Sequence, residues 1–303
     1  MWSVHSTALH DVDVNISGGK YGHPLQAASA HGHDEIVKML LDKGAHVNAQ
    51  GGEYRNAFQA AASGVEQDTR TVKLLVDAGA DVNTQAGVFG NALQGASYRG
   101  QYSIVEILLE NKANVNADGE LYYGNAIQAA AINGHHKIMR QLIDKGANVN
   151  AQGGQFSNAL QAAAAFGCPT SVELLLDEGA KVNEEGGFFG YALQAASYRG
   201  KVSIVKLLLE RGSNINVEGG TYGTALQAAS ERGHESIVQL LLEKGANLLI
   251  NSGADLNAQG GRFGNALRAA AMKGNEDVVK LLLAKGVDVD ARGEGYGTAI
   301  QLA

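Results

Sequence analysis

Residues 186–218 read GGFFGYALQAASYRGKVSIVKLLLERGSNINVE, and residues 219–247 repeat the pattern as GGTYGTALQAASERGHESIVQLLLEKGAN. It returns at residues 260–292 as GGRFGNALRAAAMKGNEDVVKLLLAKGVDVDAR. A repeat of this length decides the fold before any local feature does. Working outward at a spacing of 33 residues gives eight units: 18–50, 51–85, 86–118, 119–152, 153–185, 186–218, 219–259 and 260–292. Residues 1–17 are expected to be the remnant of a preceding repeat, and residues 293–303 a truncated ninth.

Each unit predicts two short helices and an extended finger. A polar residue precedes the A-L-Q-A-A run and is expected to cap the first helix, which a Gly then ends. The second helix carries I-V-x-L-L-L and is apolar over most of one face. Paired Gly residues before an aromatic residue predict a tight, hairpin-like finger. Because one unit cannot bury its apolar stripe alone, we expect an all-α solenoid of stacked units.

The second half of each unit carries a family resemblance. Gly32 and His33, followed at residues 36–50 by IVKMLLDKGAHVNAQ, resemble the ankyrin repeat, and the resemblance extends from about residue 12 to residue 303. One departure is systematic, since N-A-L-Q (residues 91–94) stands where the family has T-P-L-H, and only Pro24 retains the proline. This variant, with its G-G-x-Tyr-G finger, is similar to ankyrin arrays attached to large fungal NTPase or signalling proteins. The resemblance implies a protein–protein interaction scaffold.

Composition excludes several other classes. The chain has 303 residues, a single Cys and a net charge of −7. One Cys excludes a disulfide framework, and no apolar run approaches the roughly 18–20 residues that span a bilayer. The negative charge argues against charge-driven binding of nucleic acid, and the first 17 residues lack a secretory signal. We therefore expect an intracellular protein of the cytoplasm or nucleus, a monomer or part of a larger chain, without a membrane contact, metal or cofactor.

Candidate binding residues lie where the repeats differ. In ankyrin-like arrays the fingers and first helices line the concave face, so the variable positions beside the finger aromatic and after A-A-S are expected to face the groove. Cations outnumber anions at these positions although the chain is acidic, and Tyr and Arg are enriched at interface hot spots. The prediction is a protein partner, with an acidic surface, bound in the concave groove by Tyr98, Arg99, Tyr198, Arg199, His31, Tyr122, Phe166, Phe188, Glu231, Arg232, Arg262 and Lys273.

Positions that are filled alike in every unit are expected to be structural. The finger aromatics should pack against the neighbouring finger. The Gln of A-L-Q should bond the finger backbone with its amide, in place of the family's His, and Arg268 interrupts this row. His33, His135 and His234 occupy the Gly-His position and should brace adjacent loops. The eight extra residues at 247–254 should lengthen or re-enter the connection from the second helix to the next finger.

An alternative from another class stays open. The sequence contains no G-x-x-x-x-G-K-[ST], H-E-x-x-H, G-x-S-x-G or C-x-x-C motif. A small-molecule binder, or an enzyme of the isomerase or cyclase type that transfers a proton, could still be built in the groove. Arg and Tyr side chains could stabilise an enolate or oxyanion there, and His31 or Glu231 could move the proton. A scaffold predicts a shallow continuous groove, whereas an enzyme predicts a closed cavity with several titratable groups.

Overall fold

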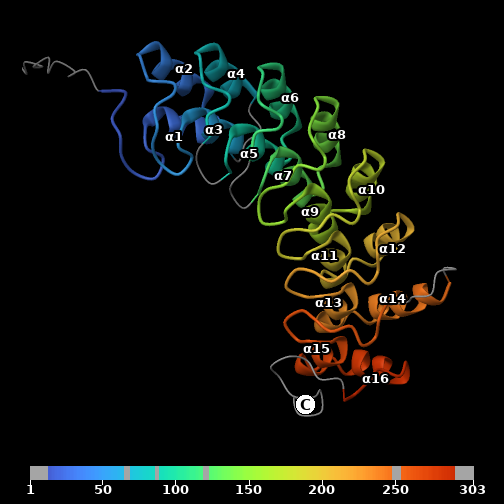
Figure 1. The fold of residues 1–303 in the computed structure, drawn as a ribbon. Helices are drawn as coiled ribbons and strands as arrows, with labels where there is room; N and C mark the ends of the chain where they lie inside the picture. The colour runs from blue at the N-terminus through green and yellow to red at the C-terminus, as the bar shows by residue number, and fades with distance from the viewer. Residues whose placement is uncertain (1–12, 65–68, 86–88, 119–122, 248–253, 291–303) are drawn as a thin grey trace, which may run out of the picture. The chain divides into compact units, whose positions relative to one another are not determined.

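The structure is a computed structural model that describes residues 13–64, 69–85, 89–118, 123–247 and 254–290. The chain divides into two compact parts, each made of several repeats and called unit 1 and unit 2 from here on. The division falls inside one first helix. Unit 1 comprises residues 1–96 and 101–114, and unit 2 comprises residues 97–100 and 115–303. Each unit is a row of stacked helix pairs joined by fingers, which is the all-α solenoid that the repeat predicts (Figure 1).

The first helices begin where the polar cap predicts. In six of them an Asn or Thr side chain accepts the backbone N–H three residues on, as Asn158 does from Gln161 at 2.9 Å. This contact satisfies an amide that the helix itself leaves unpaired. The first helices are α1 (Pro24–Ala30), α3 (Ala57–Ser63), α5 (Ala92–Arg99), α7 (Ala126–Ile132), α9 (Ala159–Phe166), α11 (Ala192–Tyr198), α13 (Ala225–Arg232) and α15 (Ala266–Met272).

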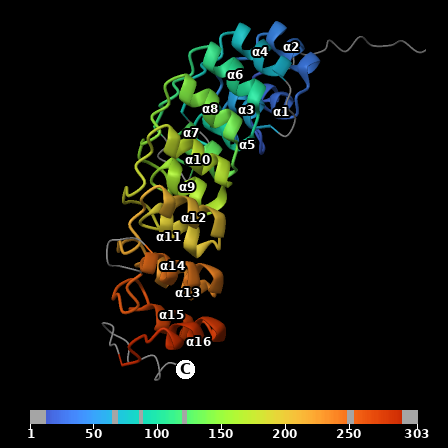
Figure 2. The ribbon, with the colours of Figure 1, turned by 90° about the vertical axis from the view of Figure 1, so that its right-hand side faces the viewer.

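The second helices form a separate row within each unit, on the side of the first helices away from the fingers (Figures 1 and 2). Most of them end at a Gly with positive φ, such as Gly212 at 86°. Lys112 takes φ 63° in the repeat that lacks this Gly. The second helices are α2 (Asp34–Asp42), α4 (Thr69–Asp77), α6 (Tyr102–Glu110), α8 (His136–Asp144), α10 (Pro169–Asp177), α12 (Val202–Glu210), α14 (Glu235–Asn247) and α16 (Glu276–Ala284).

The fingers are hairpin-like turns that stack tip against tip. Gly219 pairs with Gly223 in an isolated antiparallel bridge, and four other fingers show the equivalent bridge. Gly220 has φ 61°, and a Cβ there would lie 2.6 Å from the carbonyl oxygen of Phe189 in the preceding finger. Backbone hydrogen bonds join the tips, as from the N–H of Thr221 to the carbonyl of Phe188 at 3.1 Å. The close packing of fingers therefore depends on the missing side chain at this Gly.

The Gln row ties each first helix to the next finger. Gln194 is buried, and its Nε2 donates to the carbonyls of Val217 at 3.0 Å and Gly223 at 3.1 Å. The amides of other Gln residues in the row make the same two contacts in their own repeats. The predicted role of this row is confirmed. Arg268 takes the position in the last described repeat and is also buried.

In four of the described repeats the residue before the second helix reaches back to the preceding repeat. His135 Nε2 bonds the carbonyl of Tyr98 at 3.2 Å, and His234 Nε2 bonds that of Tyr198 at 3.0 Å, as the bracing role predicts. Amides serve at the same position elsewhere: Gln101 donates to the carbonyl of Gly64, and Asn275 to that of Ser230. The contact requires a donor at this place and does not require His.

A second row of amides was not predicted. Asn48, in the V-N pair that follows the second helix, donates from Nδ2 to the carbonyl of Gly79 at 3.1 Å and accepts at Oδ1 from the N–H of Asp81 at 2.9 Å. Both partners lie in the equivalent turn of the next repeat. The same two contacts are made by Asn15, Asn83, Asn116, Asn150 and Asn183. This Asn ladder links successive turns along each unit.

The insertion lengthens a helix without changing the register of the next joint. Helix α14 has 13 residues, whereas the other second helices have nine, and it continues through Gly245. After residues 248–253, which lie outside the described residues, the N–H of Ala254 bonds the carbonyl of Leu241, as Ser213 bonds Leu208 in the preceding repeat. Asp255 then takes its ladder contact to Asn216 at 2.8 Å. The sequence also places two extra residues around positions 63–68 and one extra finger residue at 121–123, and residues 65–68 and 121–122 lie outside the described part of the chain.

Candidate functional site

The finger aromatics form continuous rows of rings. In unit 2, Phe156 stacks on Phe189 with ring centres 6.4 Å apart, and Phe189 on Tyr222 at 6.0 Å. In unit 1, Tyr21 stacks on Tyr54 at 6.3 Å. The three rings of unit 2 are buried. The prediction that these aromatics pack against the neighbouring finger is confirmed, and they provide a rigid base for the side chains above them.

Variable residues at the helix ends add further rings to this row in unit 2. Tyr198, at the end of α11, lies 4.2 Å from the ring of Tyr222. Phe166, at the end of α9, meets Phe156 edge to face at 5.1 Å. Phe188 meets Tyr222 edge to face at 5.4 Å and is 42% exposed. Phe188 therefore presents apolar surface to solvent on a base of buried rings.

Four cations lie over these rings. The Arg199 guanidinium carbon lies 4.2 Å from the centre of the Phe166 ring, and that of Arg232 lies 5.0 Å from Tyr198. Arg262 covers two rings and Lys273 one, at distances typical of cation–π contacts. We call this surface the aromatic–cation face and define it as Phe166, Phe188, Tyr198, Arg199, Tyr222, Arg232, Arg262, Phe263 and Lys273.

A buried carboxylate fixes one of these cations. Glu231, near the end of α13, is buried, and the Arg262 guanidinium donates to both of its oxygens through Nη2 and, at 3.2 Å, Nε. These hydrogen bonds raise the pKa of Arg262. Burial, reinforced by a hydrogen bond to the Tyr198 hydroxyl, holds the pKa of Tyr222 well above its ordinary value. Tyr222 therefore stays neutral under ordinary conditions, and Arg262 stays charged.

The structure brings together most of the residues that the sequence nominates. Eight of them, counting buried Glu231, lie on or directly beneath the aromatic–cation face. Tyr98, whose ring lies 4.3 Å from Tyr123, and the exposed Arg99 stand at the end of α5, also within unit 2. His31 belongs to unit 1, where its Nε2 bonds the Tyr21 hydroxyl at 3.0 Å. Tyr122 lies outside the described residues.

Sequence reasoning did not assign Phe189, Tyr222 and Phe263 to the candidate site, because their regularity marked them as structural. They are structural, but they also support the cations. The signal that could have found them is the Arg or Lys at a neighbouring variable position, whose side chain lies over the ring.

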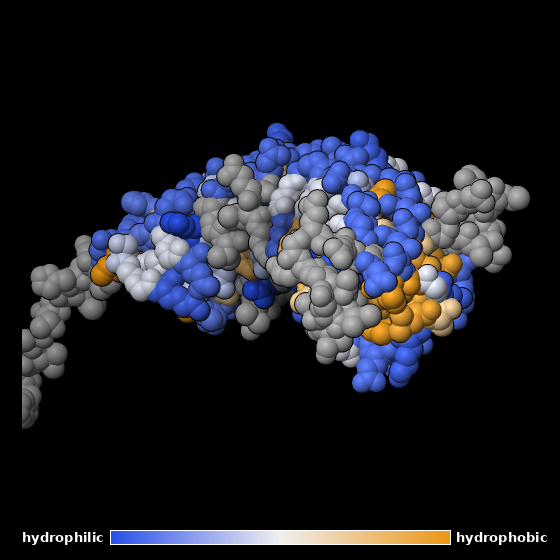
Figure 3. Space-filling model, turned by 60° about the horizontal axis from the view of Figure 1, so that its bottom comes forward, coloured by the Kyte–Doolittle hydropathy of each residue, from blue (hydrophilic) through white to orange (hydrophobic). Residues whose placement is uncertain are grey.

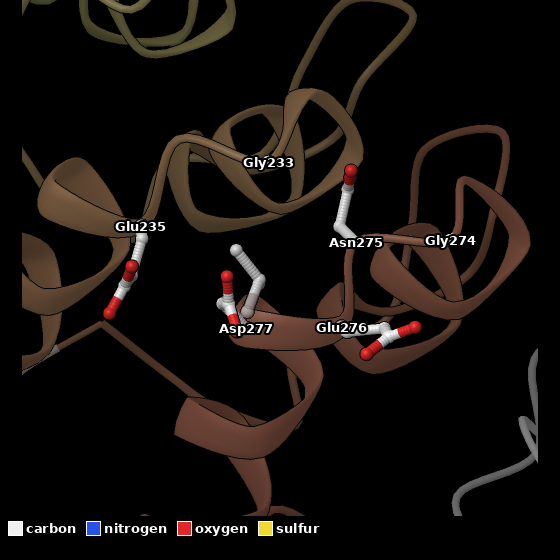
Figure 4. A pocket seen from close by; sticks show the side chains of 7 residues that line it. Gly233, Glu235, Gly274, Asn275, Glu276 and Asp277 are labelled. Carbon is white, nitrogen blue, oxygen red and sulfur yellow. The ribbon is translucent and has the colours of Figure 1, made fainter.

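Two surface depressions among the described residues are lined by none of the residues of this face. One lies at the start of α16, where the carboxylates of Glu235, Glu276 and Asp277 surround Gly233 and Asn275 (Figure 4). Another, in unit 1, is lined by Ile16, Lys20, Tyr21 and residues next to them. Within the described residues, no group of three or more His, Cys, Asp or Glu side chains is placed to hold a metal ion. The aromatic–cation face itself is suited to binding a surface by stacking and charge.

On the face seen in Figure 3 the coloured surface is mostly hydrophilic, with hydrophobic residues gathered in one part of it. Phe188 and Met272 are the large apolar side chains of unit 2 that are exposed beside the cations, at 42% and 44%. No helix among the described residues has the length and apolar character needed to cross a bilayer.

The fold and its repeating contacts define a class of proteins built from stacked helix–turn–helix units with fingers. A family model described as "Ankyrin repeats (3 copies)" matches residues 25–119, 57–153, 93–186 and 160–252. A second model, "Ankyrin repeats (many copies)", matches residues 225–283 and 267–303. The chain therefore belongs to the ankyrin repeat family, whose members are generally protein–protein interaction modules.

Two individual proteins are similar to this chain. The "Crystal structure of human ASB11 ankyrin repeat domain" matches with a TM-score of 0.61 and 27% identity, over 68% of this chain and 91% of that one. The "Azaphilone pigments biosynthesis cluster protein L" of Monascus ruber is 59% identical over 34 residues, which are 11% of this chain. The matched segment is only 7% of that relative's length.

Proposed function

We propose that the chain is an interaction scaffold that holds an acidic protein partner in the concave groove expected of an ankyrin array, with the aromatic–cation face as the main contact. The observation that supports this most directly is the stacking of arginines on a row of buried and half-buried rings. Arg199, Arg232 and Arg262 gather on one face of a chain whose net charge is −7. A local field of the opposite sign favours an acidic partner and speeds its encounter.

The proposed mechanism is recognition by a surface that is already formed. Arginines held over rings lose little side-chain freedom on binding, so less of the binding free energy is spent on ordering. Exposed Phe188 provides an apolar contact beside the charges, and Tyr and Arg are the residue types that dominate interface hot spots. The pairs Tyr98–Arg99 and Tyr198–Arg199 repeat the same elements at the ends of α5 and α11.

The test is partner capture from a lysate of the source cells by the immobilised chain. The test variant changes Tyr98, Arg99, Tyr198 and Arg199 to Ala. The control changes Arg140 and Arg211 to Ala, because these arginines pair with Glu178 and Asp177 on the second helices. We expect a protein that the wild type and the control retain and the test variant loses.

A partner retained equally by both variants would contradict the proposed face. Small molecules retained by the wild type, with no protein lost in the test variant, would favour the small-molecule alternative.

A further inference from the structure

Arg262 shows within this chain how a stacked arginine binds an acid. Its guanidinium carbon lies 5.0 Å from the centre of the Tyr222 ring and 4.9 Å from that of Phe263. At the same time it donates to both oxygens of the Glu231 carboxylate. Stacking uses the face of the planar guanidinium and leaves the N–H groups at its edge available, so the two interactions do not compete.

Arg199 and Arg232 stack on aromatic rings in the same way but have, within the described part of the chain, no carboxylate partner of the kind that Glu231 provides for Arg262. Both guanidinium carbons lie over the ring of Tyr198, at 5.8 and 5.0 Å from its centre, and Arg199 also covers Phe166. Both side chains are exposed. Among the described residues, neither has an Asp or Glu oxygen within 4 Å. Two arginines in the binding arrangement of Arg262 therefore lie near the same tyrosine ring, with their N–H edges unused by carboxylates.

We infer that Arg199 and Arg232 each bind a carboxylate from one acidic segment of a partner protein, and that Arg262 takes no part because Glu231 already occupies it. The inference rests on the proposed function and deepens it, since it names the chemical groups the partner must present. Two Asp or Glu side chains have to lie close enough together to reach both arginines at the Tyr198 ring. Each would accept two N–H groups from its arginine, as Glu231 does from Arg262.

The neighbouring side chains favour a protein segment as the source of these carboxylates. Phe188 and Met272 expose apolar surface beside the cations, which suits apolar residues placed next to the acidic ones. A nucleic acid would instead need many phosphate contacts, and the net charge of −7 opposes its approach. Charge complementarity and apolar contact therefore select the same partner, an acidic segment that also carries apolar side chains.

The experiment follows arginine side-chain Nε–Hε signals by NMR in the full chain, with the peptide Glu-Leu-Leu-Glu as the probe and Gln-Leu-Leu-Gln as its uncharged match. We expect saturable shifts of the Arg199 and Arg232 signals with the acidic peptide alone. Arg262 should not move, because its edge is occupied. Arg55 is the control for general charge effects, since it is exposed and has no described ring or carboxylate contact.

Two sets of variants sharpen the result. Arg199→Gln and Arg232→Gln should each lower the affinity for the acidic peptide about fivefold to tenfold. A tenfold loss of affinity corresponds to about 1.4 kcal/mol of binding free energy. Both residues are exposed, so the variants should fold. Glu231→Gln should release Arg262, whose signal then begins to shift with the peptide. If Glu231→Gln does not fold, Arg199→Lys tests the inference instead. This variant retains the charge but loses the paired N–H donors, so it should still weaken peptide binding.

Equal shifts of Arg55 and Arg199 would overturn the inference, because they would show only general charge attraction. A wild-type shift of Arg262 equal to that of Arg199, or equal binding of the uncharged peptide, would overturn it too. A peptide that does not bind, while a captured protein is lost with Arg199→Gln, would overturn the carboxylate pair and leave the proposed function standing. If none of the arginine variants affects capture of the partner protein, both the carboxylate inference and the proposed function are overturned.

Discussion

The fingertips of the two units use the same repeat position in different ways. In unit 1, Lys20 pairs with Glu53 of the next finger at 3.4 Å, and both side chains are largely exposed, at 65% and 46%. In unit 2, Arg262 at the same position pairs with Glu231, whose side chain is only 2% exposed. The acid lies on the neighbouring finger in the first case and beneath the finger, on a helix, in the second. The same finger position can thus carry either an exposed ion pair, as in unit 1, or one whose carboxylate is buried, as in unit 2.

The residues after A-A-S differ in a matching way. In unit 1, exposed His31 bonds the hydroxyl of the finger aromatic Tyr21. In unit 2, Tyr198 stacks on the finger aromatic Tyr222, and Arg232 covers it. The comparison teaches that the character of the surface depends on two or three variable positions in each repeat, while the finger rows beneath are alike.

The largest contrast is expected between two residues at the second Gly of the finger, one taken from each unit. Gly220 in unit 2 and Gly19 in unit 1 both have positive φ, at 61° and 68°. A Cβ at Gly220 would strike the backbone of Phe189, whereas one at Gly19 meets nothing within 4 Å. Gly220→Ala should cost about 3 kcal/mol from strain and overpacking, and Gly19→Ala about 1 kcal/mol from strain alone. Urea unfolding of both variants checks this, and equal losses would contradict the finger packing.

The two ion pairs give the next contrast. Glu231→Gln should cost about 1–2 kcal/mol, because it leaves Arg262 with a weaker acceptor, although the partly exposed guanidinium regains some hydration. Glu53→Gln in unit 1 should leave the unfolding midpoint unchanged. A loss with Glu53→Gln as large as that with Glu231→Gln would show that burial does not separate the two pairs.

A smaller, pH-dependent contrast is expected at the residue before the second helix. Burial lowers the pKa of His135 below its ordinary value of 6.5. The unfolded chain therefore binds this proton more tightly, so stability is full above about pH 6.5 and falls as pH drops from there toward the folded pKa. His135→Asn should remove this part of the pH dependence and keep the brace, as Asn275 does.

The measurement compares urea midpoints at pH 7.5 and 5.5. Gln101 makes the equivalent contact in unit 1 and does not titrate, so Gln101→His should introduce the same dependence there. An unchanged pH slope in His135→Asn would exclude His135 as its source.

The smallest effect is expected at high pH. Burial holds the pKa of Tyr222 above its ordinary value of 10.0. In the unfolded chain this tyrosine ionises at its ordinary pKa, so stability declines as pH rises above about 10. Absorbance titration of the native protein should show one fewer late-ionising tyrosine in Tyr222→Phe. An identical titration curve would show that Tyr222 is not held neutral by its surroundings.

The sequence predicts the fold well because its period, its caps and its paired Gly all indicate the same unit. The roles of the finger aromatics and of Gln194 follow from their regularity, and the structure confirms them. The Asn ladder was missed because an Asn in a turn carries no packing signal. Its partners, such as Gly79 and Asp81 for Asn48, lie about one repeat away.

The candidate site was predictable only in part. Variability between repeats nominated Arg199, Arg232 and Arg262, and it stays a prediction that a partner binds them. Glu231 was nominated as a binding residue, yet it is buried beneath Arg262. Sequence pattern could not show this, because the covering guanidinium comes from the next finger, 31 residues later.

The Asn ladder has a consequence for how such a chain can change its length. Each Asn contacts the next turn whatever the number of residues between them: Asp255 meets Asn216 across the eight-residue insertion, as Asn214 meets Asn183 without one. The ladder contact joins one turn to the next and does not depend on the number of residues between them. Whole repeats can therefore be duplicated, lost or exchanged by recombination without redesign of their neighbours.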